Sequence, residues 1–428
     1  MSIRSLGGIS LFCLGLGALA LGQAKAAPAP APAVRIDLDQ AIRLALAHSP
    51  ALAAVRAQIP QSQAQEITAN LRPNPILTWD ALYQPVFTPH NFSSAYLNNA
   101  AEYDAGVSYL FERGHKRQAR LRAAQDATAV TRSLVADAGR GLSFGVAQAF
   151  VAALLAQSSL DFARQDLASW QSTVNISQAQ YQAGAMSEGD LDTIKLQMLQ
   201  YQTTVSGDRL ALAQALSTLR QQVGFSALPA RYGVVGKLAY VPVRDTLSDL
   251  QALALAHRPD LRASTQGITA AQSQYKLAQA DGKRDLTASA QYTHAAGLSS
   301  MGYTFNIEIP VFDRNQGEIA RTAAATTQAQ DLAVAARQQV LTDVATALEA
   351  VDEGGRIVQY YTSGYRDQAK RALDIRQYSY TRGASSLLDL LDAERTYRTT
   401  ELGYRQALAG YMLAVEQLKE AVGTRTLP

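Results

Sequence analysis

Four segments of the chain alternate apolar and polar residues with a period of two. They lie at about 75–87, 101–112, 285–294 and 301–312. In each segment one set of alternate positions is rich in aromatic and aliphatic residues, and the other set is mostly polar. Such alternation predicts β-strands with one apolar and one polar face. The connections at 85–100 and 295–301 contain turn-forming residues, so the sequence predicts two pairs of strands joined by turn-like loops.

Elsewhere the apolar positions recur with helical spacing. Short amphipathic helices are predicted at 38–48 and 247–257. Each is interrupted by a residue followed by proline, at 49–50 and at 258–259, and proline is favoured at the first position of a helix. We therefore expect each dipeptide to end one helix and to begin a longer one. These longer helices are predicted to run to about residues 71 and 281.

Helices of unusual length are predicted after the strand pairs. Neither 115–181 nor 316–380 contains a proline, and a glycine pair at 354–355 is the expected weak point of the second. At about 1.5 Å per residue, some 60 residues make an element on the order of 90 Å long. A helix of that length needs partner helices along its course. Further helices are predicted at 190–223 and 389–422.

The chain is an internal duplication. Leu-Ala-Leu-Ala-His at 44–48 recurs at 253–257, and Val-Gly at 223–224 recurs at 422–423. The markers keep the same order about 200 residues apart, a spacing too long for a solenoid repeat. We divide the chain into a first repeat at 37–224, an irregular crossover at 225–244 and a second repeat at 245–428.

The N-terminus has the features of a secretory signal peptide. Residues 1–26 contain Arg4, an apolar run and a small-x-small sequence that ends at Ala26, where we expect cleavage. The apolar run is shorter than the roughly 20 residues that span a bilayer, which argues against an anchor helix. An Ala/Pro-rich leader at 27–36 is expected to be extended and unpacked. The single cysteine, Cys13, lies in the signal, so the exported chain should have no disulfide.

Composition excludes several function classes. The formal net charge is only +3, whereas a nucleic-acid binder normally shows a clustered basic face. One basic cluster, at 113–122, follows the second predicted strand, and we favour a solvated helix start at a membrane–water boundary over a phosphate or lipid site. The chain has no metalloprotease, P-loop, nucleophile-elbow or dinucleotide motif, and its histidines and methionines are scattered. No catalytic residue, cofactor or metal site is predicted.

The strand pairs have the pattern of a transmembrane β-barrel. About 10 residues is the length of a tilted membrane strand, and apolar-out, polar-in alternation is typical of an outer-membrane barrel around water. The alternative is an ordinary half-buried sheet. Four strands cannot close a barrel, and open edges in lipid leave backbone groups unsatisfied. Several chains must then share one barrel, and a trimer with twelve strands is the smallest assembly that leaves a channel.

The order, spacing and period of these segments resemble the TolC-type outer membrane factors of Gram-negative bacteria, which are trimeric exit ducts of efflux pumps. The resemblance extends from residue 38 to 423. Arg-Pro-Asn-Pro at 72–75 and Phe-Asp-Arg-Asn-Gln-Gly at 312–317 are most similar to the branch that serves heavy-metal pumps of the resistance-nodulation-division class. Many members of that branch carry a lipid on an N-terminal cysteine, and this chain has no such site.

The resemblance implies a mostly helical fold with a membrane β-barrel. In each chain, four strands would contribute to a 12-stranded trimeric barrel in the outer membrane lipid, and the long helices would form a periplasmic tunnel. The implied partners are two further copies of the chain, a periplasmic adaptor (membrane fusion protein) and an inner-membrane transporter. No nucleic acid and no cofactor is implied.

Two sets of site residues follow from the resemblance. The Asp pair in Leu-Asp-Leu-Leu-Asp-Ala would line the periplasmic aperture, with a tyrosine holding the closed tip and a counterpart aspartate in the first repeat. These are Asp389, Asp392, Tyr380 and Asp190. The tips that contact the adaptor would be Gly184, Ala185, Ser187, Gly383, Ala384 and Ser386. Asp389 is also well placed to cap a helix, a structural alternative. The family's gating arginine is absent, because Ser385 stands in its place.

One rival interpretation belongs to another class of protein. A periplasmic coiled-coil adaptor or scaffold would also have long helical hairpins, but it would lack two copies of an amphipathic strand pair. Within the channel interpretation, drug efflux and type I secretion remain alternatives to heavy-metal efflux, and the sequence names neither the cargo nor the pump.

Overall fold

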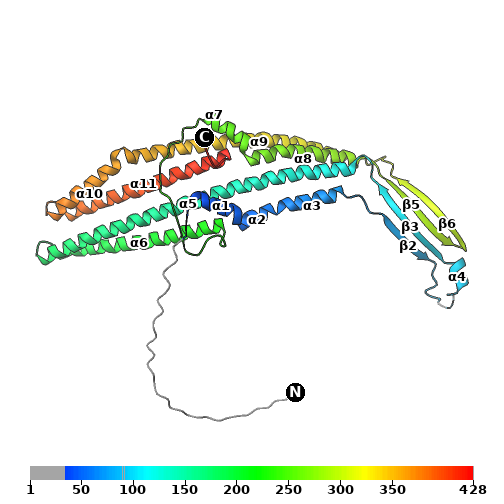
Figure 1. Ribbon diagram of the computed structural model, residues 1–428, viewed down its shortest axis with the longest axis horizontal. Coiled ribbons are helices and arrows are strands. Elements are labelled where there is room, and N and C mark those ends of the chain that lie inside the picture. Colours follow the sequence, from blue (N-terminus) through cyan, green and yellow to red (C-terminus); the bar gives the residue numbers. More distant parts are fainter. Residues whose placement is uncertain (1–33, 89, 91, 428) are drawn as a thin grey trace, which may run out of the picture.

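The computed structural model describes residues 34–88, 90 and 92–427. The molecule is long, with a β-sheet at one end, two helical hairpin tips at the other, and the C-terminus near the middle (Figure 1). The expected signal peptide and nearly all of the expected leader lie outside the described residues. The leader boundary at 36 was wrong, because β1 (Val34–Ile36) pairs in parallel with β4 (Tyr232–Val234) of the crossover. Ile36 is buried in the core, which fixes this segment.

The short helices at the start of each repeat confirm the sequence prediction. They are α1 (Leu38–His48) and α7 (Leu247–His257). The Asp37 side chain accepts a hydrogen bond from the Gln40 backbone amide, and the Gln40 side-chain oxygen accepts one from the Asp37 backbone amide, so α1 begins with a capping box. The second helix of the first repeat is divided at Ala57, whereas that of the second repeat is continuous. These helices are α2 (Pro50–Arg56), α3 (Gln58–Asn70) and α8 (Pro259–Asp281).

The longest helix is α5 (Lys116–Gln182), which at 67 residues spans about 100 Å. The prediction of a weak point at 354–355 was wrong, because α9 (Gln316–Tyr360) continues through both glycines. Tyr411 and Tyr240 pack closely against this part of the helix, where the glycines have no side chains. The helix deviates instead in a π-helical turn, η2 (Tyr361–Tyr365), where Gly364 has φ +120°. The remaining long helices are α6 (Glu188–Val223), α10 (Arg366–Thr381) and α11 (Leu387–Val422).

The helices pack side by side in two halves. On the sheet side the order is α3, α5, α8 and α9, and on the tip side it is α6, α5, α11 and α10. α5 runs through both halves and packs against helices in each of them (Figure 1). Two core clusters lie around the junction of the halves, one built from each repeat and centred on Phe150 and on Tyr411, and a third lies nearer the tips around Trp170.

The repeated Val-Gly marker ends the last helix of each repeat. Gly224 (φ +107°) lies against the His48 carbonyl, where a Cβ atom would come within 2.9 Å of the oxygen. Its counterpart Gly423 (φ +83°) lies against Arg258, where a Cβ atom would come within 3.3 Å of the backbone N and Cα atoms. In both repeats, therefore, a glycine closes the last helix onto the break between the first two helices, which explains why both sequence signals occur twice.

The predicted strands form one antiparallel sheet in the order β2-β3-β5-β6. The strands are β2 (Ile76–Leu82), β3 (Glu102–Phe111), β5 (Leu286–Ala295) and β6 (Leu298–Ile307). The two repeats thus meet through β3 and β5, which pair over nine residues from Tyr103 to Phe111.

Three strand boundaries differ from the prediction. β2 ends at Leu82 because Tyr83 has φ +53° and Pro85 follows. The expected turn at 85–100 contains a helix, α4 (Ser94–Asn99), which is capped by Ser93. The expected loop at 295–301 is a tight turn at Ala296 and Gly297, both with positive φ, so β6 begins earlier than predicted and ends at Ile307.

One described helix is long and apolar enough to cross a membrane by length and composition alone. An 18-residue window of α5 has a mean hydropathy of 1.4. Nearly half of that window is buried inside the molecule. Phe150 and Leu154 of this helix lie in the core cluster, so we attribute its apolar character to packing.

Candidate functional site

The β-sheet has one exposed apolar face that runs across all four strands. In the observed register, Trp79, Ala105, Tyr292 and Met301 occupy one level of this face, and Val107, Ala290 and Tyr303 the next. Trp79 and Tyr303 are each 71% exposed, and Phe305 is 69% exposed. Large aromatic side chains rarely form so wide an exposed patch on a soluble surface. This face therefore requires an apolar partner.

The opposite face of the sheet is polar. Asp80, Asp104, Thr293 and Ser300 lie at one level of the register, and the Thr293 hydroxyl donates a hydrogen bond to Asp104. Glycine, serine, threonine and glutamine occupy most neighbouring levels. β2 and β6 form the two edges of the sheet and each pairs on one side only within the described residues. A sheet with one apolar face, one polar face and two open edges is suited to share a barrel with other copies.

The two hairpin tips have the same backbone geometry. Gly184 (φ +72°) and Gly383 (φ +74°) each occupy a left-handed position with open space around them. The Ala185 amide donates to the Gln180 carbonyl and the Ala384 amide to the Ser379 carbonyl, at 2.8 and 2.9 Å. This bond pattern ends a helix and reverses the chain. All six predicted tip residues are exposed: Gly184, Ala185, Ser187, Gly383, Ala384 and Ser386.

A serine caps the second helix of each hairpin. Ser187 accepts a hydrogen bond from the Asp190 amide at 3.1 Å and donates to the Asp190 carboxylate. Ser386 does the same with Asp389. These bonds with Ser386 lower the pKa of Asp389 below its usual value. Asp389 thus has the capping role that the sequence offered as an alternative, and it remains exposed.

The predicted aperture residues differ in their surroundings. Asp392 lies three residues after Asp389 on the same helix face, and both side chains are exposed near the tip. Tyr380 is only 9% exposed and packs with Trp170, Ile194 and Leu390. Burial raises the pKa of its phenol. The structure therefore brings the two aspartates to the surface of the tip and places the tyrosine inside the packing of the two hairpins.

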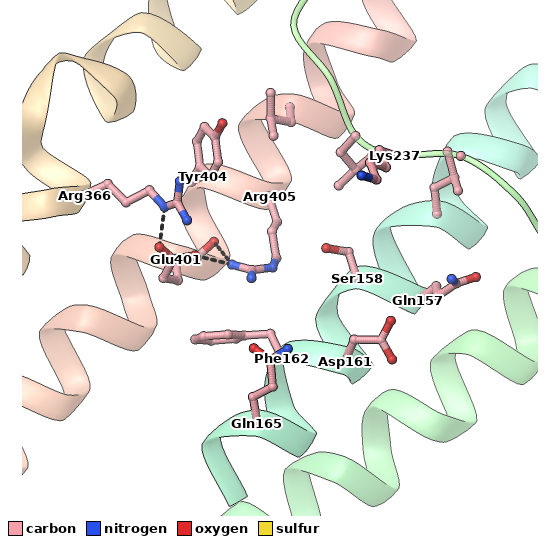
Figure 2. Close-up of a pocket in the computed structure, with 14 residues that line it drawn as sticks. Gln157, Ser158, Asp161, Phe162, Gln165, Lys237, Arg366, Glu401, Tyr404 and Arg405 are labelled. Atoms are coloured by element: carbon pink, nitrogen blue, oxygen red, sulfur yellow. Dashed lines mark hydrogen bonds and ion pairs between the residues drawn. The ribbon is translucent and has the colours of Figure 1, made fainter. Parts of the chain in front are cut away.

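A buried charged cluster on α11 was not predicted from the sequence. Glu401 is 3% exposed and bonds to Arg366 of α10 and to Arg405 one turn further along α11 (Figure 2). Arg398 forms an ion pair with Asp166 of α5 at 3.2 Å. A signal exists: charges at 394, 398, 401 and 405 recur at helical spacing on the same stripe as the buried leucines 390 and 408.

Burial shifts the ionisation of this cluster. Desolvation raises the pKa of Asp166 to about 6, although Arg398 and Arg405 oppose the shift. Desolvation, together with the charge of Asp166, raises the pKa of Glu394 to about 7. Burial also raises the pKa of Asp208 on α6. The pKa values of Asp166 and Glu394 are therefore closer to neutral pH than those of ordinary surface carboxylates.

A polar cavity of about 390 Å³ lies beside this cluster, between α5 and α11. Figure 2 shows Arg366, Glu401 and Arg405 on one side and Gln157, Asp161 and Gln165 on the other, with Lys237 of the crossover above them. The Arg405 guanidinium lies 4.3 Å from the centre of the Phe162 ring. Within the described part of the chain, no group of three or more His, Cys, Asp or Glu side chains could hold a metal ion.

Comparison with known proteins gives one family and several relatives. The model of the outer membrane efflux protein family matches residues 41–224 and 250–424. The chain is 25% identical to the pyoverdine export outer membrane protein OpmQ of Pseudomonas aeruginosa over 411 residues, 89% of this chain and 82% of OpmQ. It is 22% identical to the cobalt-zinc-cadmium resistance protein CzcC of Cupriavidus metallidurans over 321 residues, 74% of this chain and 76% of CzcC.

The fold is also found among solved structures. The crystal structure of CusC, which was used to describe folding and transmembrane channel formation, matches this chain with a TM-score of 0.73 at 18% identity. The match covers 92% of this chain and 93% of CusC. At this identity the likeness shows a shared fold.

Proposed function

Because the chain belongs to the outer membrane efflux protein family, we propose that it is the exit duct of a tripartite efflux pump. The family consists of non-enzymatic channels in the outer membrane of Gram-negative bacteria. In this proposal the duct is passive and opens when a periplasmic adaptor and an inner-membrane transporter of the resistance-nodulation-division class engage its tips. Export by a signal peptide cleaved near Ala26 is part of the same proposal.

The single observation that carries the proposal is the two-faced sheet. Its exposed aromatic face has the character of a lipid-facing surface, and its polar face has that of a water-filled lumen. Four strands with open edges require three chains for a 12-stranded barrel with a channel. A soluble adaptor or scaffold would leave this apolar face in water, which disfavours the rival interpretation.

A pair of arginine substitutions on β6 tests this arrangement. Tyr303→Arg places a charge on the apolar face and should destabilise membrane insertion by about 2–4 kcal/mol, because arginine is costly near the bilayer midplane. Heat-resistant trimers in the outer membrane fraction should then be largely lost. Thr304→Arg is the matched control: it places the same charge one residue away on the polar face, and assembly should persist. Equal assembly of both variants would contradict the barrel.

The aperture is the second feature of the proposal. Threefold symmetry would bring Asp389 and Asp392 of three chains into a narrow ring at the tip, and a ring of carboxylates selects cations. Tyr380, from inside the tip, would help to hold the closed state, and Asp190, the counterpart in the first repeat, would belong to the same aperture. The exposed tip turns at 184–187 and 383–386 would contact the adaptor.

Replacing both aperture aspartates with alanine should weaken cation selectivity. We expect reconstituted channels of the native chain to prefer cations and to be partly blocked by multivalent ones, and the double variant to lose much of both effects. Ser386 remains in place as the N-cap residue of α11, so the local loss of stability should be small. Single-channel recordings in planar bilayers measure selectivity and block. Unchanged selectivity in assembled trimers would leave Asp389 with its capping role alone.

The cargo is proposed only by class. Similarity to CzcC favours heavy-metal cations, whereas similarity to OpmQ favours a siderophore. Soft metals prefer clustered thiolate or thioether ligands, and Cys13 is the single cysteine of the chain. Metal selection would therefore belong to the transporter. Sensitivity of a deletion strain to divalent metals, compared with siderophore export and drug sensitivity, distinguishes these cargoes.

A further inference from the structure

Glu394 is a buried carboxylate in the helical half of the molecule near the tips. It is 9% exposed. Leu390 and Tyr397, one turn before and one turn after it on α11, belong to the apolar cluster around Trp170. The side chain therefore lies where α11 packs against the α5–α6 hairpin and α10. A carboxylate in such a place is destabilising when ionised unless a partner compensates its charge.

No hydrogen bond or ion pair reaches Glu394 from the described residues. The titratable and charged groups that act on it or on its neighbours come from every packed helix: Asp166 of α5, Tyr201 and Asp208 of α6, Lys370 and Asp374 of α10, and Arg398, Glu401 and Arg405 of α11. The cations are already paired. Arg398 pairs with Asp166, Lys370 with Asp374, and both Arg366 and Arg405 with Glu401. Glu394 is thus a buried carboxylate without a direct counter-ion.

Arg398 holds three helices together beside this group. Its guanidinium pairs with Asp166 of α5 and lies 4.4 Å from the centre of the Tyr201 ring of α6. Tyr201 in turn stacks on Trp170 at 5.3 Å between ring centres. At 1.5 Å per residue, Arg398 lies about 18 Å along α11 from the Ser386 cap. Packing at this level therefore decides how firmly the second hairpin lies against the first just above the tips.

We propose that Glu394 is a proton-sensing gating residue. When it is neutral, α11 stays packed on α5 and α6 and the tip is closed; when it is ionised, the excess buried charge loosens that packing and favours the open tip. The inference rests on the proposed channel function. It assigns the gate a chemical input, the proton.

The direction of the pH dependence follows from linkage. In the packed state the pKa of Glu394 is raised to about 7 from 4.5, and in a hydrated open state it returns toward 4.5. A group whose pKa is raised in one state stabilises that state at low pH, and this contribution is lost as the pH rises through about 7. Asp166, whose pKa is raised to about 6, is paired with Arg398, so we expect Glu394 to supply the response. Mild acid should therefore favour the closed tip.

Single-channel recording of purified trimers tests the proposal. The native channel should show an open probability about tenfold higher at about pH 8 than at about pH 5.5, since each pKa unit between two states is worth up to a factor of ten. Glu394→Gln keeps the shape without the titration, so its open probability should be low at both pH values. Glu353→Gln, an exposed glutamate paired with Arg356 on α9, is the matched control and should behave as the native channel.

Two further results separate the role of Glu394 from that of the aperture and from the channel function. The Asp389→Ala, Asp392→Ala double variant should keep the pH response of open probability, because Glu394 and not the aperture supplies it. If neither the native chain nor any variant conducts, the result counts against the proposed channel function itself.

Hydrogen exchange then decides the inference separately. After correction for the intrinsic pH effect on exchange, amides of α11 around Glu394 should be more protected at about pH 6 than at about pH 8. The difference should be absent in Glu394→Gln. A native pH response that survives in Glu394→Gln, by either method, would overturn the proposal.

Discussion

Replacing Trp170 with alanine should destabilise the packing of the two hairpins by about 3–5 kcal/mol, as expected for truncating a buried large aromatic side chain. Trp170 is 1% exposed, and its indole N–H donates to the Ile194 carbonyl of α6 at 3.1 Å. The substitution removes the stacking on Tyr201 and leaves a cavity where α5, α6 and α11 meet. Hydrogen exchange of the amides around 166–202 measures the loss as a lower free energy of local opening.

The chain provides a matched control for this substitution. It contains two tryptophans, and Trp79 is 71% exposed on the apolar face of the sheet. Trp79→Ala removes the same side chain without forming a buried cavity, so exchange in the helical half should be unchanged in detergent. Similar losses of protection in both variants would show that Trp170 has no special role in holding the hairpins together.

Arg258→Ala should destabilise the junction of α8, α9 and α11 by about 2–4 kcal/mol, near the range for breaking a buried ion pair. The Arg258 side chain is 4% exposed and binds Asp260 and Asp343 at 2.6 and 2.7 Å, as well as the Ala421 carbonyl. Its removal leaves both carboxylates without their cation. The loss is reduced because the two aspartates are about one third exposed and can be hydrated. Thermal unfolding followed by circular dichroism at fixed detergent measures it.

Arg321→Ala is the control for the arginine substitution. Arg321 pairs with Glu318 on the surface of α9, and its side chain is 65% exposed. Because exposed pairs contribute little, this variant should leave the free energy of unfolding nearly unchanged. Arg258→Lys is a second check, since one ammonium cannot replace the several bonds of the guanidinium. A junction as stable in Arg258→Ala as in Arg321→Ala would contradict the assigned role.

Periodicity in the sequence was enough to predict most of the fold. The bounds of α1 and α7 were predicted to the residue, because a capping residue precedes each helix and an X-Pro dipeptide follows it. The period-two segments became the four strands of the sheet, with their apolar side chains on one face. The tips at Gly184 and Gly383 were also local, since a positive φ and a serine cap depend on residues next to one another.

Only the tertiary structure decided the rest, because these features depend on residues far apart in the sequence. The glycines at 354–355 remain helical since Tyr411 of another helix packs on them, and the deviation moves to Gly364. The pairing of β3 with β5, which joins the two repeats, also depends on residues that are distant in the chain.

The buried charges show the same limit most clearly. Glutamate and arginine usually lie at the surface, and a helical stripe marks the face of Glu394 without showing what covers it. The burial of Glu394 and of Arg258 arises from contacts with helices that are distant in the chain, such as α5 for Glu394 and α11 for Arg258. Local propensity and periodicity therefore determined the elements of this protein, whereas long-range packing determined which charged side chains are buried.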